Sequence, residues 1–205
     1  YTKKQILYHF KINEKKLIVI NNHFNKIPKI KTSKSKFFTI LAIGSSENKN
    51  ISRLVDAIST INNIKLIIVG NPNKSIISKI ELLEINYKQF FNIERSQLHI
   101  LYNQADLLFF ASTKEGFGLP ILEAQSCGIP VITSNTTAMP FVAGDGAEIV
   151  DPYSINEISD AINKIKKNKS YRKEIISNGY KNIKRFTTEN FISKFENQYF
   201  MLNKK

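Results

Sequence analysis

Two carboxylates flank a glycine-rich turn in the segment "EGFGLPILE". Glu115 precedes the turn, and Glu123 follows about one turn inside a helix whose first turn suits Pro120. Gly116 and Gly118 leave backbone N–H groups unobstructed at the helix N-terminus, which is a favourable place for a phosphate. Carboxylates cannot bind phosphate, but they accept hydrogen bonds from hydroxyl groups on either side of it. The pattern therefore predicts a nucleotide-sugar site.

A second loop, "GSSENKNISR", begins at Gly44 and places Lys49 at the start of a helix, where its charge opposes the helix dipole. An anion between the lysine and the helix explains this placement, and Arg53 lies one turn further along the same face. From this loop alone, a solvated lysine is an equally good interpretation. Each glutamate taken alone is also more typical of a turn cap or a helix surface. The combination of glutamates, glycines and proline favours the functional interpretation.

Several other kinds of site are disfavoured. The chain has neither a Gly-x-Gly-x-x-Gly dinucleotide fingerprint nor a phosphate-loop Gly-Lys-Ser/Thr. Cys127 is the single cysteine, which excludes an internal disulfide, and it is most simply a small core residue. His9, His23 and His99 carry no motif and receive no role. We therefore expect no metal and no cofactor, with the nucleotide sugar acting as substrate.

These loops must be held by the elements around them. Apolar runs that alternate with helical patterns predict a doubly wound α/β domain, with a parallel sheet covered on both faces. The predicted strands are "FFTILAIG", "KLIIVG", "ADLLFFAS" and "PVITS". The predicted helices are "NISRLVDAISTI", residues 74–85, "SQLHILYNQ", "GLPILEAQSC" and three more after residue 154. In such sheets the ligand lies beyond the carboxyl ends of the strands, where both loops are expected.

The chain divides into three predicted parts. Residues 1–36 hold a helix ("TKKQILYHFKI"), a short strand ("KKLIVINN") and a basic linker that contains Pro28. Residues 37–186 form the ligand-binding domain, and residues 187–205 form a last helix. An apolar stripe at helical spacing marks that helix. It consists of Phe191, Phe195, Tyr199 and Leu202.

The composition fits a globular protein, with 42% hydrophobic residues in 205. No run of about 20 apolar residues and no signal-peptide pattern occurs, so a cytoplasmic location is expected. Thirty Lys+Arg against seventeen Asp+Glu give a formal net charge of +13. No nucleic-acid recognition motif accompanies this charge, so nucleic acid is not an expected partner. Peripheral contact with an anionic membrane at its inner face remains an alternative.

Four segments resemble the C-terminal, donor-binding domain of the retaining glycosyltransferases of family 4 (group 1), one Rossmann-like half of the GT-B fold. They are "ILAIGSSENKNISRLVDAI", "LYNQADLLFFASTKEGFGLPILEAQSCGIPVITSN", "AGDGAEIVDP" and "NGYKNIKRFTTENF". The resemblance implies a metal-independent hexosyltransferase that uses a nucleoside-diphosphate sugar. An acceptor glycan or lipid-linked sugar and a role in bacterial surface polysaccharide synthesis follow from it.

The resemblance also implies a role for each site residue. Glu115, the candidate catalytic residue, would hold hydroxyls of the donor sugar, and Glu123 would hold the ribose hydroxyls. Lys49 and the backbone of the turn, Gly116 to Gly118 with Phe117 between them, would hold the diphosphate. The predicted substrate-binding set is completed by Gly44, Arg53 and Leu119.

Three departures from the family pattern bear on these expectations. Ser45 and Ser46 stand where many members have an arginine, so Lys49 would carry more of the phosphate charge. Pro140-Phe141 stands where the family often has Pro-Glu. We expect the family's acceptor-binding domain to be absent from this chain, apart from residues 1–22, which resemble its last helix and strand. We therefore expect this chain to bind the donor but to transfer little sugar. A binding module without turnover and a sugar-nucleotide epimerase of the same architecture are the alternatives.

Overall fold

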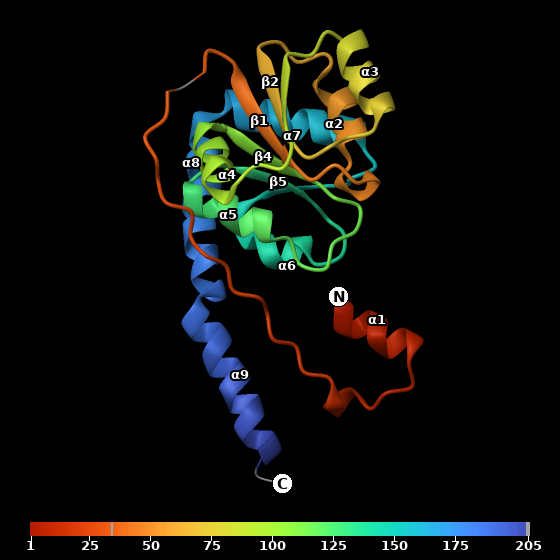
Figure 1. Cartoon of the computed structure of the whole chain (residues 1–205), viewed down its shortest axis with the longest axis vertical. Coiled ribbons are helices and arrows are strands. Elements are labelled where there is room, and N and C mark those ends of the chain that lie inside the picture. The colour runs from red at the N-terminus through yellow and green to blue at the C-terminus, as the bar shows by residue number, and fades with distance from the viewer. Residues whose placement is uncertain (34, 204–205) are drawn as a thin grey trace.

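A fully parallel sheet of six strands forms the centre of the computed structural model, which describes residues 1–33 and 35–203 (Figure 1). Its strand order is β3-β2-β1-β4-β5-β6, so the order reverses between β1 and β4. The strands are β1 (Phe38–Ile43), β2 (Ile64–Val69), β3 (Tyr87–Phe90), β4 (Leu107–Phe110), β5 (Val131–Ser134) and β6 (Glu148–Val150). The predicted doubly wound α/β fold is confirmed.

Helices cover both faces of the sheet. One face packs against α2 (Ile51–Ile58), α3 (Lys74–Leu82) and α7 (Ile155–Lys167). The other packs against α4 (Arg95–Gln104), α5 (Leu119–Cys127) and α6 (Met139–Ala143). The chain then continues through α8 (Lys169–Asn182) into α9 (Thr188–Asn203). Among the described helices, none is long and apolar enough to cross a membrane.

The apolar strands explain this two-sided covering. Successive side chains of a strand point to opposite faces, so a strand buried on both faces must be apolar throughout. Ile40 and Ala42 of β1 belong to the core on the α2 side, whereas Leu41 between them belongs to the core on the α5 side. All three are almost fully buried.

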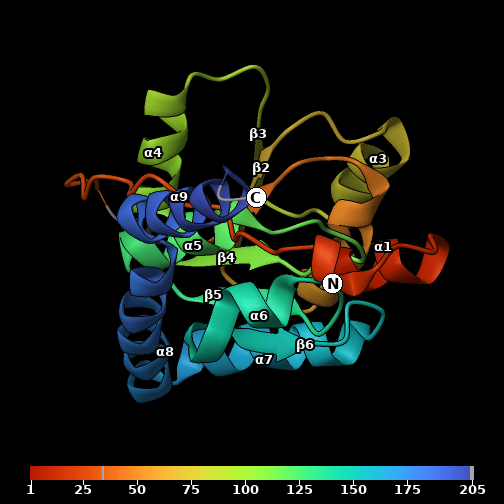
Figure 2. The ribbon, with the colours of Figure 1, turned by 90° about the horizontal axis from the view of Figure 1, so that it is seen from below.

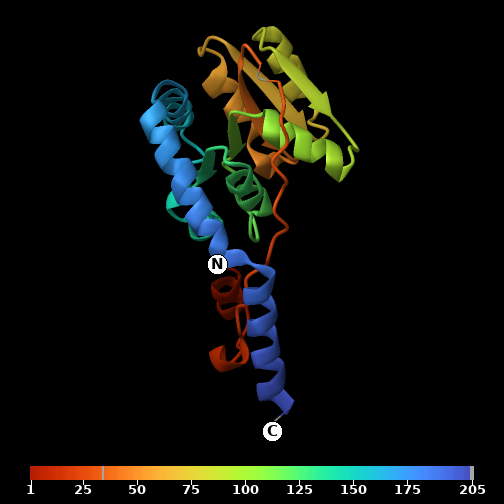
Figure 3. The same cartoon turned by 90° about the vertical axis from the view of Figure 1, so that its left-hand side faces the viewer.

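The N-terminal residues only partly follow the prediction. Helix α1 (Thr2–His9) forms, but the strand predicted for "KKLIVINN" is wrong. A short 3-10 helix, Glu14–Lys16, and irregular backbone stand in its place. An isolated apolar run cannot form a strand without a neighbour that takes up its backbone hydrogen bonds. In the views of Figures 1 and 3, α1 lies below the domain, beyond α6.

The predicted linker is irregular in its described residues, yet it is attached to the domain. Phe24 and Ile27 are buried in the core on the α5 side. The backbone N–H of Ile27 donates to Ser126 Oγ at 3.2 Å, and that of Ile30 donates to Asn103 Oδ1 at 2.9 Å. This segment therefore runs along α4 and α5 and fixes the N-terminal residues beside the domain.

The last helix, α9, extends away from the sheet (Figures 1 and 3). Its Phe191 ring contacts His23 at 5.1 Å and Phe195 at 6.3 Å between centroids. Phe195 and Tyr199 are more than half exposed, and the side chain of Leu202 lies outside the described residues. Figure 2, seen from below, shows α9 toward the side of α4 and α5, whereas α1 lies toward the side of α3.

Candidate functional site

The loop after β1 places Lys49 against the end of that strand. Gly44 has a φ of +88°, and a Cβ there would lie 2.6 Å from Cε of Lys49. A glycine is therefore required for the lysine side chain to lie across the strand end. Lys49 closes the 3-10 helix Glu47–Lys49, and Asn50 follows in the left-handed region. The Asn50 amide fixes this loop by donating to the backbone carbonyls of Ala111 and Pro152.

The loops after β1 and β4 meet at the point where the strand order reverses. Lys49 Nζ lies 2.5 Å from Glu115 Oε1, and the two side chains are only 21% and 16% exposed. Asn48 donates from Nδ2 to the carbonyl of Lys114 at 2.9 Å and to Glu115 Oε1 at 3.3 Å. Lys49 Nζ also lies 4.8 Å from the centroid of the Phe110 ring. The predicted cation and the first predicted carboxylate are therefore neighbours, although they are 66 positions apart.

The glycine turn leads directly into α5. Gly118 is the N-cap residue at φ 107° and ψ 51°, and a glycine has no side chain with which to cap the helix. A Cβ on Gly116 would meet no atom of the described residues within 4 Å, so its backbone is open to an approaching ligand. Phe117 packs edge-on against Phe186, at 5.7 Å between ring centroids. Leu119, the first residue of α5, is 39% exposed. Pro120 has no N–H, and the N–H of Ile121 donates to the Gly118 carbonyl at 3.1 Å. The groups that favour an anion here are therefore the N–H groups of the turn and of Leu119, together with the helix dipole.

The second carboxylate, Glu123, is held by a residue that the sequence did not single out. Tyr102 of α4 is fully buried, and its hydroxyl donates to Glu123 Oε2 at 2.7 Å. Burial raises the pKa of Tyr102 well above its ordinary value, and the neighbouring Glu123 charge adds to the rise. The hydroxyl therefore keeps its proton at neutral pH and acts as a donor. The signal in the sequence is a tyrosine at a core position of "HILYNQA".

Arg53 lies apart from this pair. Its Nη1 donates to Asn50 Oδ1 at 3.0 Å, and its guanidinium lies 5.0 Å from the ring centroid of Tyr153, which follows β6. The structure thus brings Gly44, Lys49 and Glu115 together and directs Arg53 toward the loop after β6.

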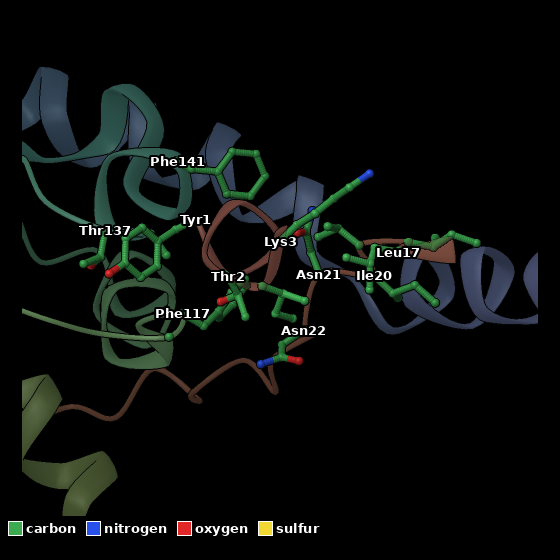
Figure 4. Close-up of a pocket in the computed structure, with 15 residues that line it drawn as sticks. Tyr1, Thr2, Lys3, Leu17, Ile20, Asn21, Asn22, Phe117, Thr137 and Phe141 are labelled. Atoms are coloured by element: carbon green, nitrogen blue, oxygen red, sulfur yellow. The ribbon is translucent and has the colours of Figure 1, made fainter. Parts of the chain in front are cut away.

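A cavity of about 680 Å³ adjoins the turn (Figure 4). On the side of the domain it is lined by Gly116, Phe117, Thr137 and Phe141. On the opposite side it is lined by residues of the N-terminal segment, residues 1–22. Thr137 connects the cavity to the site, because its Oγ1 accepts a hydrogen bond from the Glu115 N–H at 3.3 Å. Side chains from residues 1–22, Tyr1, Lys3 and Ile20 among them, form the rest of the lining.

The remaining titratable residues that the structure describes do not assemble into a metal centre. Within residues 1–33 and 35–203, no group of three or more His, Cys, Asp or Glu side chains is arranged to hold a metal ion. Cys127 is buried, which raises the pKa of its thiol to about 11. A thiol with so high a pKa is a poor nucleophile at neutral pH.

His23 contacts Thr188 and Phe191 near the start of α9.

Comparison with known proteins gives consistent matches. The model of the family described as glycosyl transferases group 1 matches residues 23–182. O-antigen chain mannosyltransferase RfbU of Salmonella typhimurium is 32% identical over 171 residues, which cover 80% of this chain and 48% of RfbU. O-antigen chain mannosyltransferase B of Escherichia coli is 40% identical over 105 residues, covering 51% of this chain and 28% of that protein. The chain thus spans less than half the length of these two relatives.

Solved structures with the same architecture include a glycosyltransferase from Rickettsia africae. Its TM-score is 0.83 at 20% identity, over 97% of this chain and 60% of that chain. HepE of Anabaena, solved in complex with UDP and glucose, has a TM-score of 0.70 at 21% identity, over 80% of this chain and 48% of that chain. At this level of identity the matches establish a shared fold.

Proposed function

The chain belongs to the group 1 glycosyl transferases, and from that premise we propose that it supplies the donor site of a retaining hexosyltransferase that uses a nucleoside-diphosphate sugar. The observation that carries the proposal is the arrangement around the N-terminus of α5. An uncapped helix start lies between Glu115, paired with Lys49, and Glu123, paired with Tyr102. A diphosphate fits the helix start, Glu115 suits the hydroxyl groups of the sugar at one end of it, and Glu123 suits those of the ribose at the other.

In this proposal the ion pair of Lys49 and Glu115 serves both the sugar and the phosphate. An ammonium group has three donors, so Lys49 can keep its bond to Glu115 while it donates to a phosphate oxygen. The glutamate then stays beside the anomeric end of the sugar and accepts from its hydroxyls. As the bond to the diphosphate breaks, negative charge grows on the leaving group. Lys49 and the N–H groups of the turn that leads into α5 stabilise that charge where it develops.

Mannose is our proposed hexose. We propose that it is added to a saccharide acceptor and that the product is a cell-surface saccharide. The support is that the similar proteins of E. coli and Salmonella are named as O-antigen chain mannosyltransferases. We place the acceptor in the cavity beside Gly116 and Phe117, because it adjoins the backbone of Glu115 through Thr137. Positioning an acceptor can contribute about 7 to 11 kcal/mol of barrier reduction, so we further propose that efficient transfer needs a polypeptide of the relatives' length.

We also propose that the reaction is cytoplasmic, with peripheral contact to an anionic membrane, and residues 1–36 support the membrane contact. Residues 1–36 hold ten lysines and one acidic residue, Glu14, so they carry nine of the thirteen net positive charges. Exposed apolar side chains, Tyr8 and Phe10 among them, accompany these lysines. Basic and apolar groups together favour an anionic lipid surface.

The test of the proposed function is a transfer assay with a protein of the relatives' length that contains these residues. UDP-, GDP- and ADP-hexoses, mannose included, are supplied with a lipid-linked or soluble saccharide acceptor, and the product is analysed by NMR. We expect a glycosidic product with the donor's anomeric configuration. An inverted product would contradict the retaining assignment. An epimerised nucleotide sugar, or tight donor binding with no product, would overturn the transferase proposal.

A further inference from the structure

The hydrogen bond between Tyr102 and Glu123 joins a fully buried hydroxyl to a partly exposed carboxylate. Tyr102 lies on α4 and Glu123 on α5, and the two helices pack side by side on the same face of the sheet. Only Oε2 of the glutamate takes part, and within the described residues no hydrogen bond to Oε1 is found. One oxygen is therefore fixed from inside the protein, and the other is left for a ligand.

A tyrosine at this place needs an explanation beyond packing. Its ring belongs to the apolar core with Leu101, Leu122 and Ile121, where a phenylalanine would fill the same volume. Burying a hydroxyl is unfavourable unless it forms a hydrogen bond, and Glu123 is the partner that the structure provides. The charged acceptor makes this bond stronger than one between neutral groups. The hydroxyl thus specifies the orientation of one carboxylate.

We infer that Tyr102 is a positioning residue for nucleotide binding, which holds Glu123 so that Oε1 faces the ribose hydroxyls of the donor. The inference rests on the proposed function, because it assigns Glu123 to the ribose. Free glutamate side chains sample several rotamers, and a ligand that needs one of them must immobilise it. Tyr102 orders the carboxylate before the nucleotide arrives.

The experiment measures binding by calorimetry with the 205-residue chain, using the nucleoside diphosphate (UDP, GDP or ADP) that the unaltered protein binds most tightly. We expect Tyr102→Phe to weaken binding roughly three- to tenfold, which corresponds to the ordering of one flexible side chain. In a Glu123→Ala background, Tyr102→Phe should have no further effect. For the 2′,3′-dideoxynucleoside diphosphate, which lacks the hydroxyls, Tyr102→Phe should have no effect at all.

Tyr171→Phe is the matched control. Tyr171 also donates its hydroxyl to a glutamate, Glu148, but that pair lies at the start of β6. Its loss should leave nucleotide affinity unchanged. A general loosening of the fold by Tyr102→Phe would weaken the ribo and dideoxy ligands equally, and that result would overturn the positioning role. Unchanged affinity in Tyr102→Phe would overturn it too.

The outcomes also separate this inference from the proposed function. If the unaltered chain binds none of the three nucleoside diphosphates, the proposed function fails, and the inference that rests on it fails with it. If the chain binds one of them and Tyr102→Phe binds equally well, the proposed function stands and Tyr102 is only a core residue.

Discussion

Two lysine–glutamate pairs occur in different regions of the domain, and each lysine also faces an aromatic ring. Lys49 pairs with Glu115 where β1 and β4 end, and it lies over Phe110. Lys164 pairs with Glu148 where β6 begins, at 3.1 Å, and lies 3.8 Å from the ring centroid of Tyr171. By residue type alone the two clusters look alike.

Their surroundings differ. Both carboxylate oxygens of Glu148 accept hydrogen bonds from Lys164, and one of them also accepts from the Tyr171 hydroxyl. The polar groups of this cluster therefore bond to one another. Lys164 is 47% exposed, and its pKa is raised mainly by its contact with Tyr171. The pair of Lys49 and Glu115 is more buried and lies beside an uncapped helix start and an open glycine turn. A binding site therefore depends on where such a pair lies, at the carboxyl edge of a parallel sheet, and not on the pair itself.

The largest expected effects come from the two glutamates of the carboxyl edge. Glu123→Ala should weaken nucleoside diphosphates with and without the sugar, because it removes the contact with the ribose. Glu115→Ala should weaken only ligands that carry the sugar. Each loss should be about 1.5 to 3 kcal/mol, or roughly tenfold to a hundredfold in affinity by calorimetry. Equal losses for both ligand types in both variants would refute this division, and Glu148→Ala is the control that should change neither.

Replacement of the two lysines tests the comparison directly. Lys49→Ala should weaken a nucleoside diphosphate about tenfold, but the free nucleoside hardly at all, because it removes a charge next to the diphosphate. The difference should shrink in high salt, since ions screen a partly exposed charge. Lys164→Ala should leave both affinities unchanged. If the two variants behave alike in titrations at low and high salt, Lys49 is an ordinary surface lysine.

The smallest expected effect concerns stability at β6. Lys164→Ala should lower the free energy of unfolding by less than about 1 kcal/mol, because exposed ion pairs contribute little. Urea denaturation monitored by circular dichroism measures this difference. A loss of several kcal/mol would mean that the cluster of Glu148, Lys164 and Tyr171 stabilises the fold far more than its exposure indicates.

Much of the fold could be predicted from the sequence because its central strands are apolar throughout. Strands β1, β2, β4 and β5 all appeared in the predicted pattern. The edge strands were missed, since β3 reads "YKQF" with two exposed residues and β6 has only three residues. The short helix α6 was missed too. The apolar run in "KKLIVINN" was misread, because periodicity does not tell whether a neighbouring strand exists.

The candidate site was predictable only where its residues are close in sequence. The turn with Glu115, its glycines and Glu123 lies within nine positions and could be recognised as a unit. The contacts of Asn48, Thr137 and Tyr102 with these glutamates join different loops and helices, and sequence spacing does not encode them. Arg53 had a suitable helical spacing from Lys49, but its contact with Tyr153 depends on the loop after β6.

The most direct test of the nucleotide-sugar site is to map amide chemical shifts of the isotope-labelled chain by NMR during titration with a nucleoside-diphosphate hexose. The account predicts that the changes concentrate in residues 44–50 and 115–123, around Lys49 and the two glutamates. The chemical shifts of the amides near Glu148, Lys164 and Tyr171 should not change. Saturable changes centred on the β6 cluster, or none at the turn before α5, would contradict the account.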